Sequence, residues 1–313
     1  MASSDAGRDA GAGVSGVLMA ALLAGLCLIW GSTWLVIRGG LNDLPPMTSA
    51  GARFVIAALA MTVVARLLGR REGGAPPPTW LWLSMGVLNF ATSYGVVYWC
   101  ETILPSGIVA VLWAVYPLMT AGAGHCFLPG ERLRGRQWAG FVFGLLGVGL
   151  LFLTDLQSLG AAAVPAALVL FISPTVSAVG TVLVKRYGAA TSSLLLNRNA
   201  MFVGAGVLLA LAWTLERDAA VVWSAQAIAS VVYLALVGTV VTFGLFFWLM
   251  RHAPAYQMSL IAYITPVIAL ALGWSVGAEP VTSMTLAGTA LILAGVALVV
   301  RVRHRGDDAG AAA

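Results

Sequence analysis

The sequence predicts an all-α integral membrane protein in which ten transmembrane helices form two inverted five-helix repeats around a central cavity. Hydrophobic residues make up 60% of the 313 residues and charged residues only 9%, whereas soluble domains average about 25% charged residues. A pattern of glycine, tryptophan and proline also recurs 149 positions later, in the pairs Gly95/Gly244, Trp99/Trp248, Pro105/Pro254 and Pro117/Pro266. Because each repeat holds an odd number of spans, the second repeat enters the membrane upside down.

Ten apolar stretches are long enough to cross a bilayer, whose ~30 Å hydrocarbon core needs about 20 helical residues. They cover residues 14–37, 47–68, 80–100, 106–128, 138–154, 161–184, 192–213, 225–250, 255–276 and 283–300. Transmembrane β-strands would be about half as long and would alternate apolar with polar residues. The first stretch follows a tail with a single basic residue, Arg8, so we expect a retained span rather than a signal peptide.

The placement of basic residues predicts the topology. With the N-terminus inside, the cytoplasmic tails and loops hold thirteen of the 17 lysines and arginines, and the outside loops hold Arg38 and Arg217. The positive-inside rule therefore places both termini in the cytoplasm of a multi-pass protein of the cytoplasmic (inner) membrane. Because topology explains the basic clusters, we expect no nucleic-acid partner.

The organisation along the chain follows from the same spans. We expect a disordered cytoplasmic tail over residues 1–13, a first repeat over 14–155, an inverted second repeat over 161–302, and a second tail over 303–313. Glycines Gly140, Gly144 and Gly147 in the fifth stretch have the spacing that allows close helix approach.

Several motifs resemble the EamA family of the drug/metabolite transporter superfamily. They are residues 30–34 (Trp-Gly-Ser-Thr-Trp), residues 98–101 (Tyr-Trp-Cys-Glu) with Pro105-Ser106-Gly107, residues 128–133 (Leu-Pro-Gly-Glu-Arg-Leu) and Glu279-Pro280. The resemblance covers residues 16–302 and implies ten-helix exporters, and residues 101–107 resemble the pigment and metabolite efflux subgroup. The resemblance does not carry over a substrate, because the family transports amino acids, nucleosides, drugs and metabolites.

Aromatic and polar side chains at helical spacing predict a substrate cavity. Its expected lining is Trp30, Thr33, Tyr94, Tyr98, Trp113, Tyr116, Ser177, Thr181 and Tyr263. Many aromatic rings and few fixed charges favour an apolar or zwitterionic organic solute over an inorganic ion. Each stripe has a simpler alternative, since serine and threonine can bond their own backbone and tyrosines favour membrane interfaces.

Four residues are candidates for coupling or gating. Arg53 and Arg198 lie inside spans at corresponding depths, where they either snorkel and pair structurally or gate and bind a substrate carboxylate. Glu101 closes the third span, and the corresponding position of the second repeat is not acidic but Met250. Glu101 is therefore either a proton-coupling group or a solvated helix-end charge. His125 is the alternative titrating group.

Pro117 and Pro266 lie in the middle of the fourth and ninth spans. Proline removes a backbone donor and clashes with the carbonyl four residues earlier, so each should kink its helix. The kinks serve either as hinges beside a cavity or as static features of packing.

The sequence thus predicts a secondary transporter that exports a small metabolite, amino acid or drug by alternating access. The alternatives are an integral membrane enzyme and a channel or sensor on the same helices. No cofactor or metal is expected, because the three cysteines stand in no paired motif. The expected partners are the small-molecule substrate and the lipid bilayer; coupling to protons, and monomer versus homodimer, stay open.

Overall fold

The computed structural model describes residues 16–129, 131–252, 257–258 and 260–310. Their regular structure is helical apart from one isolated bridge between Ala75 and Thr191. Within these described residues, eight helices are long and apolar enough to cross a membrane. The other two predicted spans are the helical run from Thr79 to Glu101 and the shorter apolar helix Ile261–Ser275. The predicted helical membrane fold is therefore confirmed.

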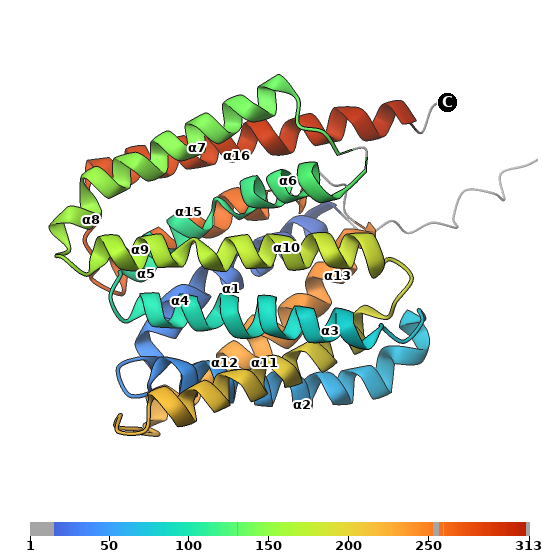
Figure 1. Cartoon of the computed structure of the whole chain (residues 1–313), viewed down its shortest axis with the longest axis horizontal. Helices are drawn as coiled ribbons and strands as arrows, with labels where there is room; N and C mark the ends of the chain where they lie inside the picture. Colours follow the sequence, from blue (N-terminus) through green and yellow to red (C-terminus); the bar gives the residue numbers. More distant parts are fainter. Residues whose placement is uncertain (1–15, 130, 253–256, 259, 311–313) are drawn as a thin grey trace, which may run out of the picture.

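The first five spans are assembled from eight helices, followed by a short connecting helix (Figure 1). They are α1 (Gly16–Gly40), α2 (Pro46–Glu72), the run α3 (Thr79–Met85), η1 (Gly86–Ser93) and α4 (Tyr94–Glu101), the pair α5 (Ser106–Trp113) and α6 (Tyr116–Phe127), then α7 (Gly135–Leu153) and the connecting helix α8 (Asp155–Ser158).

The second five spans come next along the chain. They are the pair α9 (Ala163–Leu170) and α10 (Ile172–Tyr187), then α11 (Ser193–Leu215), the run α12 (Ala225–Ala235), η2 (Leu236–Val241) and α13 (Thr242–His252), then α15 (Ile261–Ser275) and α16 (Ser283–Gly310). Helix α16 continues to Gly310, where a disordered tail was expected from residue 303, because a helix that is already formed extends at little cost. The tail over residues 1–13 lies outside the described residues.

Helices α2 and α11 lie side by side and antiparallel, and each supplies the cap of the other. The Glu216 carboxylate, directly after α11, accepts the backbone N–H groups of Met47 (2.6 Å) and Thr48 (2.8 Å) in the first turn of α2. The Glu72 carboxylate, at the end of α2, accepts the N–H of Ser193 (3.0 Å) at the start of α11. We call this pair the reciprocal carboxylate caps. They satisfy orphan donors and complement the helix dipoles.

Helices α7 and α16 form the second antiparallel pair, on the opposite side of the molecule from α2 and α11 (Figure 1). A Cβ atom on Gly140 would lie 2.6 Å from the carbonyl oxygen of Gly295, and one on Gly147 would lie 2.6 Å from that of Gly288. Only glycine permits such an approach. The close packing predicted from the glycine spacing is therefore present, within one chain and between equivalent helices of the two repeats.

The fourth span is broken rather than bent. Helix α5 ends at Trp113 and α6 begins at Tyr116, with Pro117 in the first turn of α6. Pro266, in contrast, lies inside the continuous helix α15. The third and eighth spans contain π-helical segments, η1 and η2, at corresponding positions of the two repeats. π-Helical segments are rare in proteins, and those that do occur are often found at functional sites.

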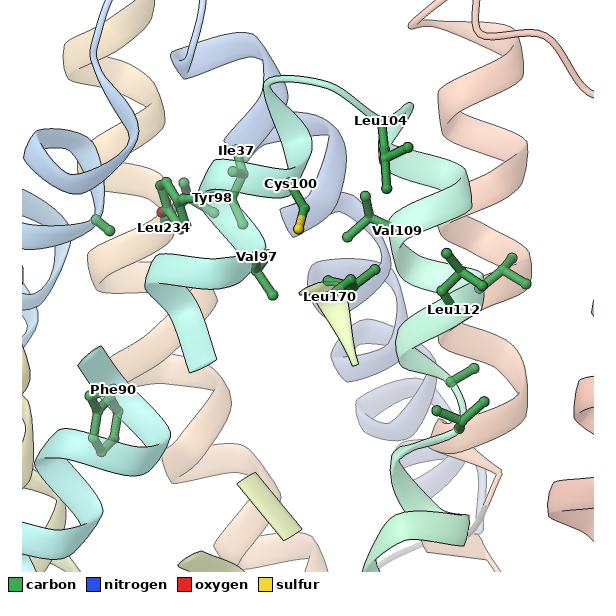
Figure 2. Close-up of a cluster of buried hydrophobic side chains, with 14 of the residues drawn as sticks. Ile37, Phe90, Val97, Tyr98, Cys100, Leu104, Val109, Leu112, Leu170 and Leu234 are labelled. Carbon is green, nitrogen blue, oxygen red and sulfur yellow. The ribbon is translucent and has the colours of Figure 1, made fainter. Parts of the chain in front are cut away.

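The remaining spans pack between the two antiparallel pairs. Side chains from α1, α4, α5, α9 and α12 meet in one buried cluster that includes Ile37, Val97, Leu112, Leu170 and Leu234 (Figure 2). This cluster fixes the relative positions of helices from both repeats. We refer below to the two ends of the bundle as the Arg38 end, where α1 ends and α2 begins, and the Lys185 end, near the end of α10.

Candidate functional site

Arg53 on α2 is the most unusual residue of the site, because its side chain is buried (1% exposed) inside the bundle. Its Nε and Nη2 atoms donate to Thr239 Oγ1 at 3.3 and 3.1 Å, and its Nη1 donates to Tyr98 OH at 3.3 Å. The guanidinium also lies over the ring of Tyr94, 4.8 Å from the centroid, as in a cation–π contact. We call these four residues the arginine cluster.

The π-helical segment η2 presents Thr239 to the arginine. The Thr239 hydroxyl donates to the carbonyl of Leu234, five residues earlier, while its oxygen accepts the guanidinium. Thus α2 and α4 of the first repeat and η2 of the second repeat together hold one buried cation. Arg53 is held inside the protein by hydroxyl groups and does not snorkel to the membrane surface.

Arg198 does not share this setting. It is half-buried, and its Nε and Nη2 donate to the side chain of its neighbour Asn199 at 3.0 and 2.7 Å. The residue 149 positions after Arg53 is Phe202, one helical turn beyond Arg198. The predicted equivalence of the two arginines is therefore wrong, because a shift of about one turn places the side chain at a different depth.

Glu101 at the end of α4 is buried (1% exposed), and neither carboxylate oxygen has a hydrogen-bond partner among the described residues. The expectation of a solvated charge is thereby overturned. Its electrostatic neighbours are Arg38, Glu279 and Arg53. An isolated buried carboxylate is costly, so this group depends on nearby positive charge or on a bound proton.

Aromatic rings and hydroxyls from α1, α5, α6 and α10 form a second group, the aromatic cluster of Trp34, Trp113, Tyr116, Ser173 and Thr181. The Trp113 ring stacks on Tyr116 at 4.7 Å and tilts against Trp34 at 6.0 Å. Its indole N–H donates to Ser173 Oγ at 3.0 Å, and the hydroxyls of Tyr116 and Thr181 are 2.7 Å apart. The three rings are half-buried, so they are partly accessible.

Serine hydroxyls join the two clusters. Ser93, which directly precedes Tyr94, lies 2.8 Å from Ser173 Oγ and accepts the hydroxyl of Ser177 at 2.8 Å. The predicted residues Tyr94, Tyr98, Trp113, Tyr116, Ser177 and Thr181 are thus all part of one connected polar and aromatic layer, to which both repeats contribute.

Four predicted residues lie elsewhere. Trp30 packs against Phe246 at 5.5 Å, and the buried Thr33 donates its hydroxyl to the carbonyl of Trp30 at 2.7 Å. Tyr263 packs, partly buried, against the main hydrophobic core. His125 accepts the N–H of Leu133 (3.1 Å) in the loop after α6, away from both clusters.

Sequence reasoning missed Trp34 and Thr239. Trp34 stands in the same motif as Trp30, one turn further on, and only the helix rotation decides which ring faces α5. Thr239 gives no signal of its own, because its role depends on the π-helical segment that turns it towards Arg53.

At the Arg38 end, Glu279 closes the junction between the repeats. Its carboxylate accepts the N–H groups of Ser106 (2.7 Å) and Gly107 (2.9 Å) at the start of α5, and it lies 3.7 Å from Arg38 Nε. Arg38 Nη1 donates to the carbonyls of Glu101 and Leu104 at 2.6 and 2.7 Å. A groove of about 610 Å³ opens beside these residues, between α1, α12 and the turn before α16.

The Lys185 end carries the equivalent acidic residue, Glu131. It pairs with Lys185 and lies against Gly124, as Glu279 lies against Gly273. Arg186 donates to the carbonyl of Phe127 at 3.0 Å. Each end of the bundle therefore places a glutamate, a basic residue from the other half and a glycine next to one another.

The sequence profile of the EamA-like transporter family matches this chain twice, over residues 15–153 and 164–301. The uncharacterized inner membrane transporter YedA of Escherichia coli K12 is 31% identical over 289 residues, which cover 90% of each chain. The uncharacterized transporter YoaV of Bacillus subtilis is 24% identical over 86% of this chain and 92% of its own. Protein PecM of Dickeya dadantii is 26% identical over 87% and 88%.

One crystal structure has the same fold, with a TM-score of 0.64 at 19% identity over 93% of this chain and 99% of the other. The family profile covers nearly all of both five-span halves, and the spans, the repeated motifs and the relatives agree with it. The chain therefore belongs to the EamA-like transporter family and is a multi-pass membrane transporter.

Proposed function

We propose that this transporter carries a small organic solute out of the cytoplasm by alternating access, with both termini in the cytoplasm and the Arg38 end outside. The distribution of basic residues supports the orientation, since only Arg38 and Arg217 fall on the outer side. The substrate classes that fit are metabolites, amino acids and drugs with an apolar or zwitterionic body.

The observation that carries this proposal is the connected layer made of the arginine cluster and the aromatic cluster. Side chains of the two repeats bond one another there, in the contacts Arg53–Thr239, Trp113–Ser173 and Tyr116–Thr181. A site that opens to each side in turn must lie at the interface of the repeats, where both halves can release it. Half-buried rings offer a large contact area at little cost in conformational entropy.

Glu101 is our candidate for the proton-coupling group. Its oxygens are buried without hydrogen-bond partners among the described residues, and the charges that act on it are Arg38, Glu279 and Arg53. A proton that neutralises this carboxylate changes its attraction to Arg38 and Arg53 together. Proton binding at Glu101 would thereby act both on the Arg38 end and on the arginine cluster.

The decisive experiment is solute counterflow in proteoliposomes containing the purified full-length chain. Vesicles loaded with unlabelled amino acids, nucleosides or aromatic cations are tested for uptake of the labelled solute against empty-vesicle controls. Counterflow of at least one solute, absent from vesicles without protein, supports the carrier. Downhill flux that does not show exchange points to a channel, and conversion of the solute without flux points to an enzyme.

A further inference from the structure

The start of α5 is already a carboxylate-binding site in this conformation, and its occupant is the chain's own Glu279. Two backbone N–H groups, those of Ser106 and Gly107, point at the two carboxylate oxygens at 2.7 and 2.9 Å. Arg38 adds positive charge at 3.7 Å. Converging amides at a helix start with a nearby guanidinium are the arrangement that recognises a carboxylate.

A second observation shows that this site holds an unused donor. The side-chain oxygen of Ser106 is buried, and it has no hydrogen-bond partner among the described residues. The residue is 0% exposed and forms the first position of α5. The Ser106 hydroxyl does not bond Glu279 in this conformation, so it stays available as a donor to a ligand of different shape that occupies the same amides.

The groove at the Arg38 end leads to this site. Its volume of about 610 Å³ falls in the range that accommodates a small organic ligand. Arg38 and Glu279 line it, together with the apolar side chains of Leu35, Val36 and Val276 and the polar side chains of Asn42, Gln226, Ser230 and Tyr233. A ligand in the groove therefore meets two residues of the carboxylate site as well as apolar and hydrogen-bonding surface.

We propose that this groove is a vestibule for a small organic carboxylate, which takes the place of Glu279 on the amides of Ser106 and Gly107. The apolar body of the ligand lies along the groove, and its carboxylate accepts the two N–H groups and the Ser106 hydroxyl. Displacement of Glu279 releases the turn before α16 from α5, so ligand binding opens the Arg38 end. This inference rests on the proposed function for its role in transport, but the binding site stands without it.

The test measures binding to the purified full-length protein with benzoate as the probe and neutral benzamide as its isosteric control. Wild type should bind benzoate and not benzamide. Glu279→Gln removes the charge of the internal competitor, so benzoate should bind about tenfold more tightly, in line with the effect of one charge at a helix start. Glu216→Gln alters a carboxylate with the same capping role on α2, at the same end but outside the groove, and should leave benzoate affinity unchanged.

Ser106→Ala is the second variant, and it should fold normally because its hydroxyl has no partner to lose. Its benzoate affinity should fall severalfold while its unfolding temperature stays that of wild type. Equal binding of benzoate and benzamide, or unchanged benzoate affinity in both Glu279→Gln and Ser106→Ala, would overturn the proposal. Competition by phosphatidylglycerol vesicles that abolishes benzoate binding would assign the groove to a lipid headgroup instead.

Binding and counterflow measurements on the same purified protein separate this inference from the proposed function. Benzoate binding that responds to both variants, in a protein without counterflow of any solute, would support the vestibule and contradict the carrier function. Counterflow with no benzoate binding would support the carrier function and contradict the vestibule.

Discussion

At the residue scale, the site is built from groups that gain a role only through their partners. Arg53 is a buried cation because Thr239 and Tyr98 bring hydroxyls to it and Tyr94 brings a ring face. The buried Tyr98 thus acts on the arginine, whereas the rings of the aromatic cluster are half-buried and therefore within reach of a solute. Trp113 is the ring through which substrate recognition is best tested.

Trp113→Ala should weaken substrate affinity in counterflow by roughly 1–3 kcal/mol, because it removes one large ring from the contact surface. The Trp113 ring stacks on Tyr116 and tilts against Trp34. Trp80→Ala is the control, since Trp80 is 46% exposed and lies at the edge of Tyr187. Wild-type affinity in a folded Trp113→Ala protein would remove the aromatic cluster from the substrate site.

Glu101→Gln should abolish uptake driven by a pH gradient and keep counterflow, because the amide cannot bind the transported proton but leaves the solute site in place. The measurement compares gradient-driven accumulation with exchange in the same vesicles. Asp43→Asn changes a carboxylate at the same end, bonded to Ser224, and should keep both activities. Intact gradient-driven uptake in Glu101→Gln would show that the proton binds elsewhere.

At the element scale, the two repeats handle proline differently. The fourth span is interrupted between Trp113 and Tyr116, just before Pro117, whereas α15 runs unbroken through Pro266. The interruption lies between Trp113 and Tyr116 of the aromatic cluster, so movement of α6 against α5 would rearrange the cluster itself.

Pro117→Ala and Pro266→Ala should each slow transport more than they change substrate affinity or protein level. Alanine restores the backbone donor and removes the clash, so the helix loses the weak point about which we propose that the halves rock. Turnover and affinity are measured separately in counterflow, with the loop variant Pro76→Ala, at an exposed position, as the control. Normal turnover in both span variants would reduce the prolines to static packing features.

The close packing of α7 against α16 depends on glycines, which place no side chain between the two helices. Gly147→Ala would place a Cβ 2.6 Å from the carbonyl oxygen of Gly288, a distance that forces the helices apart. Overpacking of this kind costs about 1–3 kcal/mol. Thermal unfolding in detergent should therefore show a lower unfolding temperature for Gly147→Ala.

Gly149→Ala is the matched control on the same helix. A Cβ at Gly149 meets nothing within 4 Å, and alanine is the better helix former, so its unfolding temperature should equal or exceed that of wild type. Similar destabilisation by both substitutions would show that the close approach of α7 and α16 is not what holds them together.

At the scale of the whole molecule, both repeats contribute to each of the two clusters, and the topology is the first claim to test. A reporter enzyme that is active only outside the cytoplasm, fused after Ala313, should be silent, because ten spans return the chain to the side where it started. The same reporter fused in the loop after Glu216 should be active. An active C-terminal fusion would mean that the number of spans is odd.

Much of this architecture could be predicted from the sequence, because span length and repeat spacing are local properties. The ten apolar stretches predicted the positions of the helices, and Pro117 predicted that the helix of the fourth span is distorted. The partners of Arg53 could not be predicted, since Thr239 lies 186 residues away and faces the arginine only through a π-helical turn. The bond between Glu279 and the start of α5 likewise joins opposite halves of the chain.

The reciprocal carboxylate caps have an implication for the ancestry of the chain. Glu72 holds the start of α11 and Glu216 holds the start of α2, so each half gives the other what it receives. The exchange has the form of a contact across a twofold axis. The two glutamates stand 144 rather than 149 positions apart, so they are not equivalent residues of the two repeats. The two halves have therefore diverged in sequence at this contact while each still caps a helix of the other, and they have diverged likewise at Arg53 and its counterpart Phe202.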